Sequence, residues 1–136
     1  MWIKPTDECI FIDQRKEVKP NIQARWQHLP FKDESFEMVV FDPPFHVTRW
    51  QPPDEKARGN DFYGFLLPDT FHRDFYDAFK EFFRVLKTGG FLILKWNDAR
   101  YSLNKILSLA PKKPLFGQRS WSNKSGQHSS WVTFQK

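Results

Sequence analysis

The fold of this chain is decided by the stretch Phe36-Glu37-Met38-Val39-Val40-Phe41-Asp42-Pro43-Pro44-Phe45. Residues 38–41 form a continuous apolar run, which is typical of a strand buried on both faces of a sheet. Proline cannot donate to a strand ladder, so the strand is predicted to end at the Asp42-Pro43-Pro44-Phe45 turn. This places a carboxylate at the end of a central strand, where α/β sheets usually bind their ligands.

Other segments predict strands and helices in alternation around this strand. Residues 71–86 carry apolar side chains at helical spacing, and Lys87-Thr88-Gly89-Gly90 is predicted to end that helix with glycine. We expect strands over residues 9–12, 22–26, 36–41, 91–94, 115–116 and 130–134, helices over 71–86 and 103–109, and a polar loop over 118–129. This order predicts one α/β domain over residues 1–136 with a mainly parallel sheet.

Composition bounds the classes of function. The 136 residues suit one domain, and 40% hydrophobic residues argue against disorder. The net charge of +5 favours a polyanionic partner such as nucleic acid, although many basic proteins bind none. A single cysteine and four scattered histidines predict no disulfide and no metal site. With no membrane-length apolar run and no signal-peptide pattern, we expect a cytoplasmic protein that binds no membrane.

The turn at residues 42–45 carries groups suited to an exocyclic amine. The lone pair of such an amine is delocalised into the ring, so both its hydrogens must be held before the nitrogen can attack. Asp42 can accept one hydrogen and the carbonyl of Pro43 the other, while the prolines keep the acceptors rigid. Phe45 offers a face for base stacking, and a duplex base would first be flipped out. The alternative is a strand-ending turn with an ordinary core phenylalanine.

Leu29-Pro30-Phe31, the turn at residues 42–45 and Arg84-Val85-Leu86-Lys87-Thr88-Gly89-Gly90 together resemble class I S-adenosylmethionine-dependent methyltransferases. Lys95-Trp96-Asn97 and Pro114-Leu115-Phe116-Gly117 are similar to stretches in short methyltransferase-like proteins of phages and prophages. The resemblance implies a truncated Rossmann-like fold, with a mostly parallel sheet and an antiparallel C-terminal strand. It also implies S-adenosylmethionine as cofactor and Asp42, Pro43, Pro44 and Phe45 as the catalytic, amine-binding turn.

The same resemblance implies the cofactor contacts. Asp13, which ends an early strand, is expected near the ribose hydroxyls, and Gln27 and His28 are expected to border the adenine. Asp42 is expected to contact both cofactor and substrate. Asp13, Asp42 and residues 95–97 each follow a predicted strand, so we expect them to share one edge of the sheet.

Substrate contacts are expected from two further segments. The predicted set is Phe45, His46, Arg49, Trp50, Lys95, Trp96 and Asn97. Basic and aromatic residues after the turn suit contact with a single strand, and a solvated surface loop is the alternative. Trp96 is equally compatible with a place in the core, where Lys95 and Asn97 would simply end the strand.

The chain departs from the family pattern at its start. The usual first strand and glycine-rich loop are missing, because the twelve residues before Asp13 contain no glycine. In one interpretation, residues 9–12 lie beside residues 38–41 and a compact site binds the cofactor. In a second, a partner subunit or a homodimer completes the site. The third is a non-catalytic, nucleic-acid-binding or regulatory module. The activity predicted first is methylation of adenine or cytosine amines in DNA, with RNA second.

Overall fold

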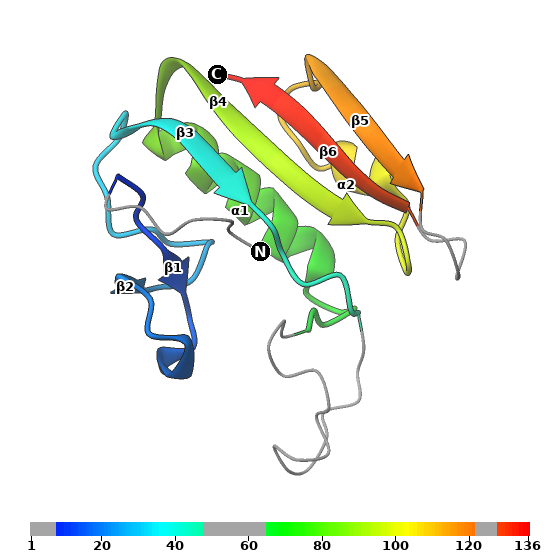
Figure 1. Ribbon diagram of the computed structural model, residues 1–136, viewed down its shortest axis with the longest axis horizontal. Coiled ribbons are helices and arrows are strands. Elements are labelled where there is room, and N and C mark those ends of the chain that lie inside the picture. The colour runs from blue at the N-terminus through cyan, green and yellow to red at the C-terminus, as the bar shows by residue number, and fades with distance from the viewer. Residues whose placement is uncertain (1–7, 48–64, 122–127) are drawn as a thin grey trace.

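The structure is a computed structural model that describes residues 8–47, 65–121 and 128–136. Four strands form its main sheet in the order β3-β4-β6-β5 (Figure 1). Their bounds are Phe36–Phe41 for β3, Leu86–Asn97 for β4, Phe116–Trp121 for β5 and His128–Gln135 for β6. β3 and β4 run parallel, whereas β6 is antiparallel to both β4 and β5. Among the described strands of this sheet, β6 therefore runs against the other three, as expected for an antiparallel C-terminal strand.

Strand β3 occupies the predicted residues and ends directly at Asp42. It pairs with β4 from Met38 opposite Phe91 to Phe41 opposite Leu94. β4 is longer than the predicted 91–94, because it also pairs with β6 as far as Asn97. Since β3 and β4 are parallel, Asp42 and Asn97 lie at the same end of the sheet.

Helix α1 spans Phe71–Val85 and packs its apolar stripe against the sheet. The predicted apolar positions are at most 3% exposed: Phe71, Phe75, Phe79, Phe82 and Leu86. They pack on the inward side chains of the strands, including Phe41, Leu92, Leu94, Val132 and Phe134. Phenylalanines at helical spacing therefore build most of this core.

The predicted glycine cap of this helix is wrong. α1 ends at Val85, and Leu86 already has an extended backbone. Gly89, with φ of 81°, lies instead within β4, where the register with β3 is irregular. A Cβ on Gly90 would be 2.9 Å from the carbonyl oxygen of Glu37, so the two strands approach too closely there for a side chain. These glycines therefore shape the sheet.

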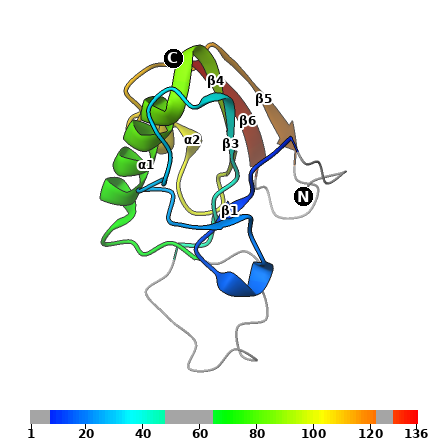
Figure 2. The same ribbon diagram turned by 90° about the vertical axis from the view of Figure 1, so that its left-hand side faces the viewer.

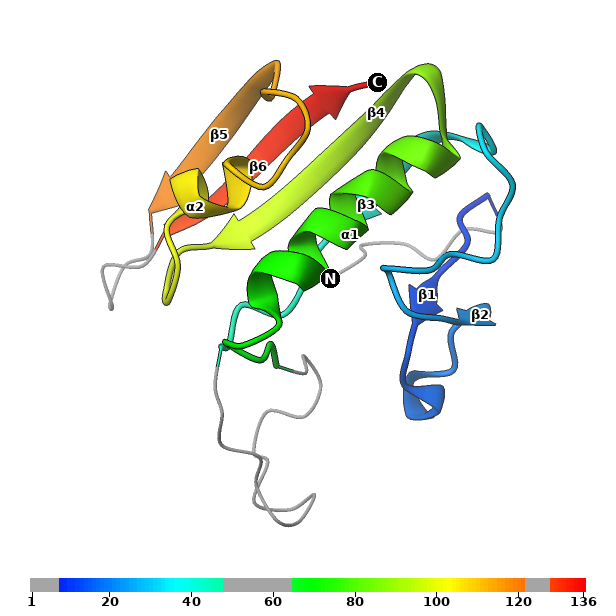
Figure 3. The same ribbon diagram turned by 180° about the vertical axis from the view of Figure 1, so that it is seen from behind.

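The second helix, α2 (Leu103–Leu107), lies on the same face of the sheet as α1 (Figures 2 and 3). Ser102 caps it by accepting a hydrogen bond from the backbone N–H of Lys105, and Ile106 is fully buried. Among the described residues, no helix covers the opposite face, where Met38, Phe91, Trp131 and Phe116 are exposed. Nor is any helix in the described ranges long and apolar enough to cross a membrane.

The N-terminal strands are much shorter than expected. β1 (Ile12–Asp13) and β2 (Ile22–Gln23) pair only with each other, in parallel, around the 3-10 turn η1 (Lys16–Val18). The placement of residues 9–12 beside residues 38–41 is therefore wrong. The N-terminal segment contacts the main sheet at Trp26. The Trp26 ring packs edge-on against that of Phe41 in β3, with ring centroids 5.4 Å apart.

Both ends of the predicted polar loop over residues 118–129 are strand, while residues 122–127 lie outside the described residues. β5 continues to Trp121 and β6 begins at His128, with Gln118 opposite Trp131 and Ser120 opposite Ser129. Antiparallel strands at an edge can point polar side chains to solvent, so their polarity does not prevent pairing. Polar composition alone was a misleading signal for a loop.

Candidate active site

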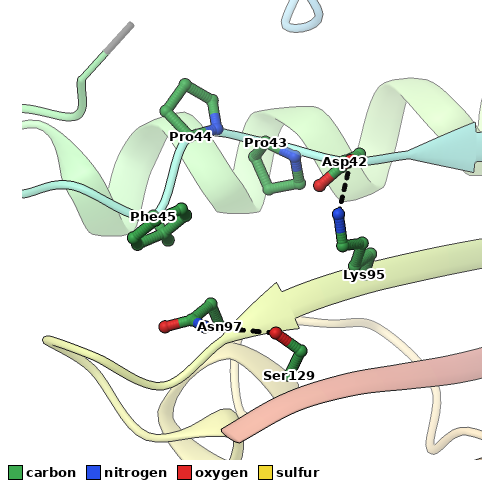
Figure 4. A pocket seen from close by; sticks show the side chains of 7 residues that line it. All are labelled: Asp42, Pro43, Pro44, Phe45, Lys95, Asn97 and Ser129. Carbon is green, nitrogen blue, oxygen red and sulfur yellow. Dashed lines mark hydrogen bonds and ion pairs between the residues drawn. The ribbon is translucent and has the colours of Figure 1, made fainter. Parts of the chain in front are cut away.

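The Asp42-Pro43-Pro44-Phe45 turn lines a pocket of about 90 Å³ at the end of β3 (Figure 4). The facing wall is built by Lys95 and Asn97 of β4 and by Ser129 of β6. Figure 4 shows the pocket between these two rows of side chains. Three strands meet here because β3 and β4 end at this edge and the antiparallel β6 begins there.

Lys95 orients the Asp42 carboxylate. Its Nζ donates to Oδ2 of Asp42 over 2.9 Å, and their side chains are 32% and 44% exposed. Such a solvent-screened ion pair contributes little to stability. Its main effect is to fix the orientation of the Asp42 carboxylate. The ammonium also lies 5.7 Å from the ring centroid of Trp131. Among the described residues, Lys95 is the only hydrogen-bonding partner of the Asp42 side chain, which leaves Oδ1 available to a ligand.

Asn97 and Ser129 form the other polar part of the pocket. Asn97 Nδ2 donates to Ser129 Oγ over 3.1 Å, and Asn97 Oδ1 accepts from the backbone N–H of Ala99 over 3.0 Å. Ser129 is not among the predicted site residues, because it lies inside the stretch expected to be a polar loop. Only the antiparallel register, with Asn97 opposite Ser129, brings it to the site, and no spacing in the sequence signals that.

Trp96 does not face this pocket, so its predicted substrate contact is wrong. Its side chain is 1% exposed, and its Nε1 donates to the carbonyl of Tyr101 over 2.8 Å. Side chains alternate along a strand, so Lys95 and Asn97 point to one face of β4 while Trp96 points into the core. The core alternative is the one observed.

Asp13 is not among the residues that line this pocket, so the expected shared edge is not observed there. Its carboxylate accepts hydrogen bonds of 2.8 to 3.0 Å from the backbone N–H, Nε and Nη2 of Arg15. Burial raises the pKa of Asp13, but these bonds and the charge of Arg15 outweigh it and bring the pKa below its usual value. Arg15 thus holds Asp13 as a carboxylate.

The remaining predicted residues lie in several places. Gln27 is half-buried, while His28 is exposed and donates its backbone N–H to the carbonyl of Arg25 over 3.0 Å. His46 is exposed, and its ring lies on that of Phe45 with centroids 4.4 Å apart. Arg49 and Trp50 lie outside the described residues.

One buried polar atom next to Gln27 lacks a hydrogen-bond partner among the described residues. Trp26 Nε1 is buried and makes no hydrogen bond within the described part of the chain. Buried N–H groups are usually paired. Trp26 also packs against Phe41, the residue before Asp42. The stretch expected to border the adenine therefore begins beside the end of β3.

The fold of this chain is similar to those of two solved structures. A crystal structure of the PH0226 protein from Pyrococcus horikoshii OT3 aligns over 88% of this chain, with a TM-score of 0.50 and 17% identity. A protein from Thermus thermophilus, TTHA0409, provisionally named a DNA modification methylase, aligns over 79% with the same TM-score and identity. This chain spans 62% of the first and 47% of the second. No protein-family model and no curated protein sequence matches it.

Proposed function

We propose that this chain is an S-adenosylmethionine-dependent methyltransferase acting on an exocyclic amine of a nucleic-acid base. Adenine or cytosine in DNA is the first candidate substrate and RNA the second. The observation that carries the proposal is the Asp42 carboxylate at the end of β3, oriented by Lys95 and sharing a pocket with Pro43 and Phe45. The methyltransferase-like fold and the net charge of +5 support it.

In the proposed reaction, the turn prepares the amine nitrogen. Oδ1 of Asp42 accepts one amine hydrogen and the carbonyl of Pro43 the other, so the lone pair is withdrawn from the ring and directed at the incoming methyl group. Lys95 and the two prolines keep these acceptors in place before the substrate arrives. Phe45 stacks on the base. S-adenosylmethionine, when bound, would supply the methyl group, with the C–N bond forming as the C–S bond breaks and S-adenosylhomocysteine leaves. The methylated amine would then lose a proton to solvent.

The pocket fits the reacting amine, but it is too small for the whole cofactor. Its volume of about 90 Å³ is below the roughly 300–1,000 Å³ typical of small-molecule sites. We propose that Asp13, Gln27 and His28 hold the ribose and adenine outside it. A carboxylate accepts about four hydrogen bonds, and three already come from Arg15. A ribose hydroxyl would therefore share Asp13 with Arg15.

A second candidate follows from the incomplete sheet. Among the described strands, β3 has β4 as its sole partner, and β1 and β2 form a separate pair. An open strand edge is a template for another strand. This favours a site completed by a partner subunit or by a homodimer. A methyltransferase-like module that binds nucleic acid without turnover is the non-catalytic form of this candidate.

Transfer of tritiated methyl groups from S-adenosylmethionine to DNA and RNA of mixed sequence tests the proposal. Asp42→Ala should lower transfer by about 10²- to 10³-fold, the usual cost of one preorganised polar group. Nucleic-acid affinity should change less than twofold. Asp77→Ala, on the helix-covered side of the sheet, is the matched control. Unchanged labelling by Asp42→Ala would refute the assignment, and a wild type that binds nucleic acid without transfer would favour the second candidate.

A further inference from the structure

We infer that Asn97 and Ser129 select the base by donating hydrogen bonds to the ring nitrogen next to the target amine. The inference rests on the proposed function, because it takes Asp42 and Pro43 as the amine-binding side of the pocket. Asn97 and Ser129, on the wall that faces the turn, would thus determine which base is bound. The acceptors of the turn at residues 42–45 contact only the amine and cannot make this distinction. The ligand class is a base with an unprotonated ring nitrogen beside its exocyclic amine.

The orientation of the Asn97 amide is set by its surroundings. The backbone N–H of Ala99 donates to one end of this amide, which must therefore be the oxygen. The other end is then the NH₂ group, and one of its hydrogens is donated to Ser129 Oγ. Within the described residues, the second hydrogen has no acceptor, although Asn97 is half-buried and lines the pocket. Asn97 thus presents a fixed donor.

Ser129 extends the donor side. Its hydroxyl oxygen accepts from Asn97, and no described residue accepts the hydroxyl proton. Its position is constrained because its backbone carbonyl accepts from Ser120 Oγ over 2.9 Å, and β6 pairs with both neighbouring strands. Lys95 adds a third donor on the same wall. Donors therefore line the β4–β6 wall, and acceptors line the turn.

This arrangement matches the edge of adenine or cytosine. In adenine N1, and in cytosine N3, an unprotonated ring nitrogen adjoins the carbon that bears the amine. When the amine lies against Asp42 and Pro43, that nitrogen faces the donors of Asn97 and Ser129. Guanine differs because its amine-bearing carbon lies between N3, which is an acceptor, and N1, which carries a hydrogen. The donor wall would therefore oppose guanine when N1 is turned toward it and could pair with it only through N3. A ligand that leaves a buried polar group of the site without a hydrogen bond loses affinity. The site therefore discriminates strongly against that ligand.

Removal of the ring nitrogen from the ligand tests this directly. The probes are single-stranded deoxyadenosine and deoxycytidine 12-mers and the same oligomers made with 1-deazaadenine or 3-deazacytosine. Fluorescence anisotropy measures their affinity for the full chain without cofactor. The wild type should bind at least one natural oligomer about 2- to 10-fold more tightly than its deaza form, the value of one hydrogen bond. Phosphate contacts are the same in each pair and cancel from the ratio.

Asn97→Asp is the decisive variant, because it keeps an oxygen for the N–H of Ala99 and removes the donor. Its natural-to-deaza ratio should fall to about one, and Ser129→Ala should lower the ratio partially. Asn104→Asp, the same chemical change on an exposed position of α2, should leave the ratio unchanged. Thermal unfolding of each variant confirms that it is folded.

A wild-type ratio near one, or a ratio that Asn97→Asp leaves unchanged, would overturn the inference. Methyl transfer is measured separately on the natural oligomers. Discrimination without transfer would support base recognition by Asn97 and contradict the proposed enzyme. Transfer without discrimination would support the enzyme and contradict the inference.

Discussion

The Arg84 side chain holds the segment before β3 against helix α1. Its guanidinium donates to both carboxylate oxygens of Glu81 at 2.7 and 2.8 Å and to Asp33 at 2.8 Å. It also donates to the carbonyls of Phe31 at 2.8 Å and Leu29 at 3.1 Å. Glu81 in turn accepts from the backbone N–H of Leu29 over 2.7 Å. Replacing Arg84 by methionine removes every one of these donors and keeps an apolar side chain.

The expected loss of stability follows from the exposure of each partner. Asp33 is 76% exposed, so its pair with Arg84, itself 31% exposed, contributes less than about 1 kcal/mol. Glu81 is 14% exposed. Its two-pronged pair with Arg84 contributes about 1 kcal/mol after solvent screening, and each of the two carbonyl hydrogen bonds contributes about 1 kcal/mol. We expect Arg84→Met to lower the free energy of unfolding by about 3 kcal/mol. For a domain of this size, that corresponds to a decrease in Tm of about 10 °C.

The loss of unfolding free energy in Arg84→Met should depend on pH, because Glu81 must be ionised to pair with Arg84. Hydrogen bonds from Arg84 lower the pKa of Glu81 most; burial raises it less, and Leu29 and the charge of Arg84 lower it further. Because the folded pKa lies below the usual 4.5, this stabilisation is present above about pH 4.5. It is lost as the pH falls through the folded pKa. The difference between wild type and variant should therefore be largest at neutral pH.

Urea unfolding followed by circular dichroism at pH 7 and pH 3 measures both quantities. Arg73→Met, at an exposed position of the same helix, controls for the loss of one positive charge. A loss below about 0.5 kcal/mol at pH 7, the usual range of surface substitutions, would refute the role given to Arg84. So would an equal difference between Arg84→Met and wild type at both pH values.

Two further substitutions test the β3–β4 pairing and the site. Gly90→Ala should destabilise the protein by about 1–3 kcal/mol, because the new Cβ would be 2.9 Å from the carbonyl oxygens of Glu37 and Lys87; thermal unfolding would contradict this if Tm did not change. Lys95→Met should lower kcat for methyl transfer by about 10- to 100-fold through loss of Asp42 orientation, with Lys95→Arg recovering part of it. A changed KM with unchanged kcat would instead indicate a role in substrate binding.

Local signals predicted some elements closely and others poorly. The apolar run of β3 and the phenylalanine spacing of α1 were sufficient, because burial on both faces or along one stripe leaves a direct pattern in the sequence. The N-terminal strands were overestimated, since only two residue pairs form between β1 and β2. The length of β5 was underestimated, because edge strands tolerate polar residues. The predicted glycine cap of the helix was wrong. Gly89 and Gly90 lie in β4, where Gly90 allows close approach to β3.

The sequence by itself determined that a strand ends in Asp42-Pro43-Pro44-Phe45, because an apolar run and two prolines are local features. Only the tertiary structure decided what faces that turn. Strand alternation directs Trp96 into the core and leaves Lys95 and Asn97 at the pocket, while the antiparallel register of β6 adds Ser129. The tertiary structure also decided that β1, which ends at Asp13, pairs with β2 apart from the main sheet. Such contacts depend on register between distant segments, and a one-residue shift would reverse every side chain.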